Sequence, residues 1–157
     1  MDLSGFVPGC MGPTNVSLTN ALWVELDTVR LGWSSAWCLF GDFNTIKYTV
    51  ERFGCTSFSP SKFKFSDFIE KHSLVDLPLM GVDYTWFRGS NNPSTSRINR
   101  VFISTKWEDH FLDVTQRLLP HVLSNHCPSL VEAGGMSRGK SPFKFEKYVA
   151  EGGGFCG

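Results

Sequence analysis

The sequence predicts one mixed α/β domain. Short apolar runs of strand length alternate along the chain with segments whose apolar residues recur at helical spacing, and no internal repeat or glycine-rich phosphate loop interrupts this order. The chain has 157 residues, of which 41% are hydrophobic and 14% aromatic. This length suits one domain rather than two, and the apolar content is sufficient for a packed core.

The first third of the chain predicts two strands around a helix. Residues 5–13 are short, apolar and rich in Gly and Pro, which is typical of a strand fragment that enters a turn. Apolar residues then recur at helical spacing over 18–29, where Thr14 or Asn15 can cap the helix. The apolar run 37–40 predicts a buried strand.

The remaining two thirds predict shorter elements. After a polar loop over 47–64, residues 65–72 carry apolar side chains on one face of a second helix. Further elements are strands at 74–79, 84–87, 101–103, 114–119 and 127–131, a turn-rich loop at 88–97 and a short helix at 107–111. A shift to Gly, Ser, Arg and Lys at 133–142 marks a linker. We therefore place the domain at 5–132 and expect 133–157 to be mostly flexible.

Charge and cysteine content narrow the function classes. Fifteen Lys and Arg balance fifteen Asp and Glu, so the chain lacks the basic excess that is usual in nucleic-acid-binding domains. The five cysteines form no C-x-x-C pair, which favours free thiols over a disulfide framework or a zinc site. The sequence shows no signal sequence and no apolar stretch near the roughly 18 residues of a membrane span. We expect an intracellular protein, cytoplasmic or nuclear.

Three clusters of polar side chains stand at predicted strand ends. They are Asp42 with Asn44, Arg97 with Asn99 and Arg100, and Asn125 with His126. A carboxylate, amides and an imidazole in such places are groups that a hydrolytic metal site uses. Each cluster alone also has an ordinary structural explanation, because Asp and Asn are common turn formers after a strand.

These clusters and the residues around them resemble, in the same order, the motifs of a known family. Residues 39–46 (LFGDFNTI) resemble the GDFN motif of the endonuclease/exonuclease/phosphatase family, and residues 84–86 (YTW) match a strand of its plant LINE-type members. Residues 96–104 (SRINRVFIS) and 124–128 (SNHCP) are similar to their S-R-L-D-R-F and S-D-H-C-P segments. Three further segments are similar as well: LWVEL at 22–26, DLPLMG at 76–81 and PFKFE at 142–146. The chain thus resembles the C-terminal part of the endonuclease domain of a LINE-type (non-LTR) retrotransposon.

The resemblance implies a DNase I-like fold, a four-layer α/β sandwich of which this chain would hold the C-terminal half. It also implies Mg²⁺-assisted attack of water on a phosphodiester of DNA, with Asp42, Asn44 and His126 as catalytic residues. Asp42 and Asn125 would be the metal ligands. Asn99 and Asn125 stand where the family has Asp, so each removes a negative charge from a site for a hard dication. Asn99 also lacks the carboxylate that would orient His126. We expect Mg²⁺ binding to be weak or absent.

Positions upstream also depart from the family pattern. Its Y-x-P-N segment aligns with residues 11–14 (MGPT), so the Tyr and the Asn are replaced. Its catalytic Glu, the principal metal ligand, belongs to the N-terminal half of the domain. We expect a chain that starts near the middle of this fold to leave one sheet unpaired. Such a chain would be marginally stable or depend on a partner, for example the missing N-terminal half.

Three functions remain open at this point. We favour a truncated, degenerate and catalytically inactive Mg²⁺-dependent endonuclease of a LINE-type retroelement. The first alternative is a residual metal-dependent phosphodiesterase that uses the catalytic residues named above. The second is a non-catalytic nucleic-acid-binding module whose DNA contacts come from a basic and aromatic patch formed by Arg97, Arg100, Lys106, Trp86 and Phe87.

Overall fold

The computed structural model describes residues 5–6, 8–11, 16–55, 60–89, 93–120, 125, 127–134 and 146–147. Its elements, in chain order, are β1 (Gly5–Phe6), β2 (Pro8–Met11), α1 (Val16–Gly32), β3 (Ala36–Asp42), the 3₁₀ helix η1 (Thr49–Glu51), α2 (Pro60–Lys71), β4 (Leu74–Asp76), β5 (Leu79–Met80), β6 (Trp86–Arg88), β7 (Ser94–Ser96), β8 (Asn99–Ser104), α3 (Thr105–His110), β9 (Leu112–Leu118), β10 (Ser129–Gly134) and β11 (Glu146–Lys147).

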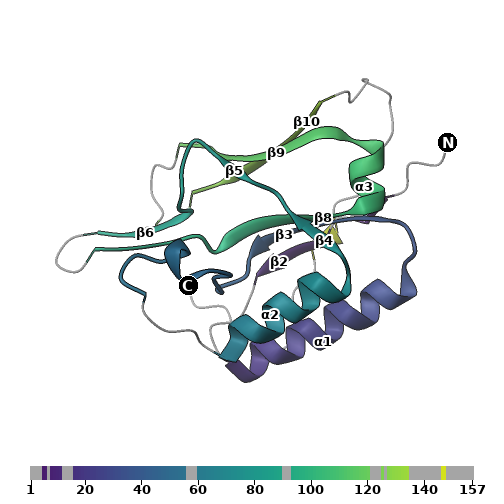
Figure 1. Ribbon diagram of the computed structural model, residues 1–157, viewed down its shortest axis with the longest axis horizontal. Coiled ribbons are helices and arrows are strands. Elements are labelled where there is room, and N and C mark those ends of the chain that lie inside the picture. Colours follow the sequence, from purple (N-terminus) through teal and green to yellow (C-terminus); the bar gives the residue numbers. More distant parts are fainter. Residues whose placement is uncertain are drawn as a thin grey trace.

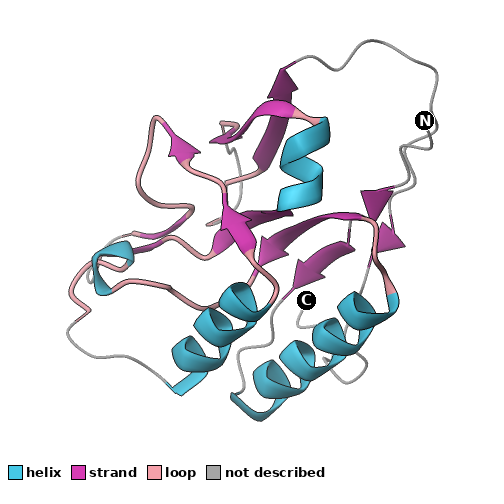
Figure 2. Cartoon of the chain, turned by 45° about the vertical axis from the view of Figure 1, so that its right-hand side comes forward, coloured by secondary structure: helices cyan, strands magenta, loops and turns pink. Residues whose placement is uncertain are grey.

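These elements form layers (Figure 1). The larger sheet has the strand order β11-β2-β3-β8-β4, and β1 also pairs with β3. Strand β2 runs parallel to β3, whereas β8 runs antiparallel to both β3 and β4. Helices α1 and α2 lie side by side on one face of this sheet, and a second sheet in the order β10-β9-β5 lies on the other (Figure 2). The mixed α/β fold class predicted from the sequence is confirmed.

Aromatic rings fill the space between the helices and the larger sheet. Trp23 of α1 stacks on Phe43, which follows β3, with ring centroids 5.8 Å apart. Trp23 also contacts Phe65 and Phe68 of α2, and Phe102 of β8 meets Phe43 edge-on at 5.4 Å. All five rings are buried. Because these contacts join both helices to two adjacent strands, burial of aromatic surface holds the helical layer on the sheet.

The strands of the larger sheet supply apolar side chains to both of its faces. Along β3, Trp37 and Leu39 belong to the cluster under the helices, whereas Cys38 belongs to the cluster on the opposite face. This alternation follows from the pleat of a β-strand. Val114 of β9 and Val131 of β10 pack against the second cluster. The larger sheet is therefore covered on both faces.

Several element boundaries differ from those predicted. Helix α2 begins at Pro60, inside the predicted polar loop, because proline suits the first turn of a helix. The predicted strand 74–79 is two strands in different sheets, and Pro78 between them cannot donate a ladder hydrogen bond. Strand β7 was missed, since its sequence Ser-Thr-Ser has no apolar alternation.

The predicted end of the domain at residue 132 falls inside a strand. Strand β10 continues to Gly134, and β11 pairs in parallel with β2. The last two residues of β10 and the whole of β11 belong to the stretch 133–157, which was expected to be mostly flexible. The rest of that stretch, 135–145 and 148–157, lies outside the described residues, as do the predicted helix caps Thr14 and Asn15.

The predictions about the cysteines and about membrane spans can be compared with the structure. Cys38, Cys55 and Cys127 are free thiols, and burial raises the pKa of the Cys38 thiol to about 12. A thiol with such a pKa is protonated and unreactive at neutral pH. Within the described residues, no helix has the length and apolar character that crossing a bilayer requires.

Replacement of Phe43 tests the aromatic cluster. Phe43→Ala should lower the free energy of unfolding by about 3–5 kcal/mol, because it removes a fully buried ring and leaves a cavity. Phe63 lies on the outer face of α2, where 62% of the residue is exposed. Phe63→Ala should therefore cost less than about 0.5 kcal/mol. Urea denaturation of both variants measures the difference, and equal losses would contradict the role given to the cluster.

Candidate functional site

The predicted polar clusters meet at one end of the larger sheet. Asp42 is the last residue of β3, Asn99 is the first residue of β8, and the two are register partners in the antiparallel pair. On the other side of Asp42, its partner in the parallel pair is Met11, the last residue of β2. The pairing of the strands thus brings three segments of the predicted site together, although they lie far apart in the sequence.

A turn fixes the strand end that carries Asp42. The Asp42 Oδ1 atom accepts a hydrogen bond from the backbone N–H of Asn44 at 2.8 Å. Asn44 has a φ of 50°, in the left-handed region that Asn adopts more readily than most residues. The backbone N–H of Phe43 donates to the Ile98 carbonyl at 3.0 Å. The Asp42 carboxylate therefore has a structural task in the turn, besides any chemical one.

A buried threonine joins the other two segments. The Thr85 hydroxyl accepts hydrogen bonds from two successive backbone N–H groups, the second being that of Asn99, at 3.0 and 2.9 Å. The Thr85 carbonyl accepts from the N–H of Cys127 at 3.1 Å, and the N–H of Phe87 donates to the Asn125 carbonyl at 2.9 Å. Asn125 and Cys127 are therefore held against residues 85–87, and Thr85 links Cys127 to the start of β8.

The side chain of Asn99 makes a contact that a carboxylate could not make. Its Nδ2 atom donates to the Cys127 carbonyl at 3.4 Å. A carboxylate has no hydrogen to donate there. The Asn99 Oδ1 atom is buried and has no hydrogen-bond partner within the described residues. Gln116, which the sequence did not single out, donates to the Asn99 carbonyl at 3.3 Å and to the Ser129 hydroxyl at 3.2 Å.

The third cluster is only partly within the described residues. Asn125 is exposed, and its backbone carbonyl makes the contact to β6 described above. His126 lies outside the described residues. The structure therefore places Cys127, the residue after the histidine, beside Asn99, while the imidazole itself has no described position.

The donors at this end of the sheet do not fit a tightly held Mg²⁺. Asp42 contributes a carboxylate, but Asn99 and Asn125 offer only neutral amide oxygens. Among the residues that the structure describes, no three His, Cys, Asp or Glu side chains gather in a way that could hold a metal ion. Mg²⁺ prefers anionic oxygen ligands, and Asp42 is the one carboxylate among these three residues.

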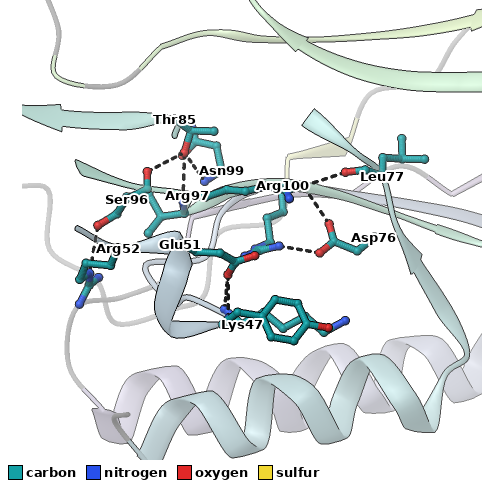
Figure 3. A network of polar contacts seen from close by, with 12 residues as sticks. Lys47, Glu51, Arg52, Asp76, Leu77, Thr85, Ser96, Arg97, Asn99 and Arg100 are labelled. Atoms are coloured by element: carbon teal, nitrogen blue, oxygen red, sulfur yellow. Dashed lines mark hydrogen bonds and ion pairs between the residues drawn. The ribbon is translucent and has the colours of Figure 1, made fainter. Parts of the chain in front are cut away.

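A buried ionic network centred on Arg100 lies next to this end of the sheet, and the sequence did not predict it (Figure 3). Arg100 is only 1% exposed, and its two terminal nitrogens bind the Glu51 carboxylate and, at 2.5 Å, Asp76 Oδ2. Its guanidinium carbon also lies 5.8 Å from the centroid of the Phe65 ring. The network thus joins η1 and β4 to β8, next to the strand position of Asn99.

Glu51 also organises the turn that precedes it. Its Oε2 atom accepts hydrogen bonds from the backbone N–H groups of Lys47 at 2.7 Å and Tyr48 at 2.9 Å. Burial alone would raise the pKa of this carboxyl. The guanidinium of Arg100 and the two N–H groups outweigh that effect and hold the pKa below its usual value. Glu51 is therefore anionic at neutral pH.

Arg97 and Arg100 were predicted to contact nucleic acid, but in the structure both are paired with carboxylates of the network. Arg100 lies inside the molecule. Arg97 is mostly buried and donates to the Leu77 carbonyl at 2.8 Å and to Asp76 Oδ1 at 3.3 Å. Burial and the neighbouring Arg100 charge lower the pKa of Arg97, although the network carboxylates oppose them. Lys106 lies elsewhere, on α3. These residues do not form the predicted basic patch, because the arginines serve as internal counter-charges.

Removal of Arg100 tests the network. Arg100→Ala should lower the free energy of unfolding by about 3–5 kcal/mol, because Glu51 would remain in the interior without its counter-charge and Asp76 would keep only Arg97. Arg117 supplies a matched control, since it pairs with Glu132 at 2.8 Å on the surface. Arg117→Ala should cost less than about 1 kcal/mol. A loss for Arg100→Ala as small as that of the control, measured by urea denaturation, would contradict the network's role.

The lowered pKa of Glu51 predicts a pH dependence. Its stabilising contribution is complete above the ordinary carboxyl value of 4.5 and is lost as the pH falls through the lower pKa of the folded state. The free energy of unfolding should therefore decline below about pH 4.5. In Glu51→Gln, which is less stable at neutral pH, this decline should be shallower. Parallel pH profiles of the two proteins would rule out Glu51 as a source of the acid sensitivity.

Comparison with solved structures shows the fold. The 3′-5′ exonuclease NExo from Neisseria meningitidis superposes with a TM-score of 0.59 and 18% sequence identity, over 74% of this chain and 52% of the exonuclease. The endonuclease domain of TRAS1, a telomere-specific non-LTR retrotransposon, gives a TM-score of 0.61 and 12% identity, over 82% of this chain and 56% of that domain. The 3′ phosphatase NExo from Neisseria, solved with a product DNA hairpin, gives 0.58 and 19%, over 74% and 52%.

No protein-family model matches the sequence, and a search of curated proteins found no relative. The identities to the solved structures are below 20%, so the likeness establishes the fold and nothing finer. The chain spans about half the length of each of these proteins. Within that span, its helices and sheets have the arrangement of the DNase I-like α/β fold.

Proposed function

We propose that this chain is a degenerate relative of the Mg²⁺-dependent DNA endonucleases of LINE-type retroelements, and that it no longer hydrolyses phosphodiesters. We further propose that it corresponds to the C-terminal part of such a domain. The DNase I-like fold and the likeness to a retrotransposon endonuclease domain support the relation. The ordered motifs at 41–44, 84–86, 96–100 and 124–128 support the LINE type.

The observation that carries the proposed loss of chemistry is the amide of Asn99 beside Asp42. These two residues are direct partners in the sheet, so the side chain at position 99 belongs to the immediate surroundings of the Asp42 carboxylate. With Asn at 99 and 125, neutral amides replace two of the three carboxylates that the family pattern has within the span of this chain. A dication at this place would lack most of its compensating charge, and water activation by a metal depends on that ion.

The amide also changes the setting of the histidine. The family pattern has a carboxylate at position 99 that holds the imidazole in one tautomer, and loss of such a partner costs about 10- to 100-fold at metal-site histidines. Here the Nδ2 atom of Asn99 donates to the Cys127 carbonyl, and the side chain keeps only a neutral oxygen as acceptor. The proposed inactive state thus has its own local hydrogen bond, which reversal to Asp would remove.

DNA is the partner that the resemblance implies, and one of the similar structures holds a DNA hairpin. For this chain we propose only weak DNA affinity that falls with salt, because the formal net charge is zero and Arg100 is an internal counter-charge. We propose the N-terminal half of a DNase I-like domain as its structural partner.

Nicking of supercoiled plasmid in Mg²⁺ tests the proposal. We expect no nicking by the native chain and none by Asp42→Ala. The double variant Asn99→Asp/Asn125→Asp restores both carboxylates, and we expect it to bind Mg²⁺ more tightly than the native chain, measured as a larger rise in melting temperature with added MgCl₂. Nicking by the double variant would show that the two amides alone silenced the site.

The outcomes separate the alternatives. Nicking by the native chain that disappears in Asp42→Ala would overturn the proposal in favour of a residual phosphodiesterase. Nicking that survives in Asp42→Ala would identify a contaminating nuclease. DNA binding without nicking, steeply dependent on salt, would favour the non-catalytic binding module.

A further inference from the structure

A groove lies between the turn that contains η1 and the loop that follows β5. It has a volume of about 400 Å³, within the range of sites that hold small ligands or single side chains. The turn contributes Tyr48 and Val50 to its lining, β5 contributes Leu79, and the loop after β5 contributes Val82 and Tyr84. Asp42 and Asn99 do not line it, so the groove is distinct from the sheet end described above.

The apolar residues around the groove are more exposed than core residues of the same type. Val50 is 78% exposed, Tyr48 55% and Val82 43%. These side chains come from two segments about thirty positions apart in the sequence, and they meet around one concavity. Exposed apolar side chains that gather at a concave surface, rather than being scattered singly, are typical of an interaction site.

Charge indicates what kind of partner fits. Glu51 and Arg97 line the groove, but both belong to the buried network, where Glu51 is paired with Arg100 and Arg97 with Asp76. Asp83 also lines the groove and is exposed, and none of the ion pairs within the described residues includes it. The unbalanced charge at the groove is therefore negative.

Lys47 is a cation next to Tyr48, one of the residues that line the groove. The Nζ atom of Lys47 lies 5.3 Å from the centroid of the Tyr48 ring. Lys47 is not among the residues that line the groove, and its ammonium is engaged with the ring. It does not neutralise Asp83 by an ion pair within the described part of the chain.

We propose that this groove binds a short segment of a protein partner, which inserts an aliphatic or aromatic side chain between Val50 and Val82 and places a Lys or Arg against Asp83. The apolar lining supplies the affinity, and the Asp83 carboxylate selects the neighbouring charge. A nucleic acid fits less well, because its phosphates would be repelled by Asp83 and the guanidinium of Arg97 is already paired. This inference is independent of the function proposed above.

Two dipeptide probes test the groove in solution. Backbone amide NMR signals of the full chain are followed during titration with N-acetyl-lysyl-tryptophanamide and with N-acetyl-glutamyl-tryptophanamide. We expect both probes to shift the signals of residues 48–51 and 79–84. At low salt the lysyl probe should bind about two- to fivefold more tightly than the glutamyl probe, the preference that one exposed ion pair provides. High salt should reduce this preference.

Variants separate the contribution of the Asp83 charge from that of the apolar lining. Asp83→Asn should abolish the preference for the lysyl probe, whereas the matched change Asp109→Asn on α3 should leave it unchanged. Val50→Gln alters a highly exposed side chain, so the fold should persist while the affinity for both probes falls at least threefold. No signal shifts with either probe, or equal affinity for the two at low salt, would overturn the proposal. Shifts of the same signals by an octathymidylate but by neither dipeptide would also overturn it and identify a nucleic-acid surface.

Discussion

The pairing of Arg100 with Glu51 and Asp76 is the constraint on which the surrounding structure depends. A guanidinium in the interior is tolerable only when its charge is matched and its hydrogens are bound. Arg100 meets this condition by holding one carboxylate from η1 and another from β4. Glu51 in turn binds the backbone of the turn 47–51, which follows the strand end with Asp42 and Asn44. The turn next to the candidate site is therefore held in place by the buried ion pairs of Arg100.

The geometry of the candidate site depends on the backbone more than on its polar side chains. Strand pairing brings Asp42 to Asn99, and the hydroxyl and carbonyl of Thr85 tie the start of β8 to the segment at Cys127. None of these contacts needs a carboxylate at position 99. A change from Asp to Asn preserves the shape of the side chain and alters its charge, so these contacts do not depend on which of the two residues stands at position 99. This separation explains why likeness of fold is weak evidence for activity.

Much of the fold was readable from the sequence because the relevant signals are local. The helical period over 18–29 and the aromatic face at 65–72 gave α1 and α2, and the short apolar runs gave β3 and β8. The strand assignments failed where local pattern is uninformative. Polar β7 has no alternation, and the split between β4 and β5 depends on which sheet each piece joins. Arg100 directly before the apolar run at 101–103 was a signal for a buried ion pair, since arginine is rarely buried without a partner.

The sequence by itself determined the fold class, the order of the motifs and the chemical identity of the candidate site residues, including the two amides at 99 and 125. Tertiary structure decided which of those residues lie together and which face solvent. The partners of Arg100 are 24 and 49 positions away, so no local pattern could show that its charge is internal rather than available to DNA. The same holds for the groove at Val50 and Val82, whose halves meet only in the folded chain. Periodicity records the environment of a residue along its own element, whereas burial and ion pairing are set by contacts between distant elements.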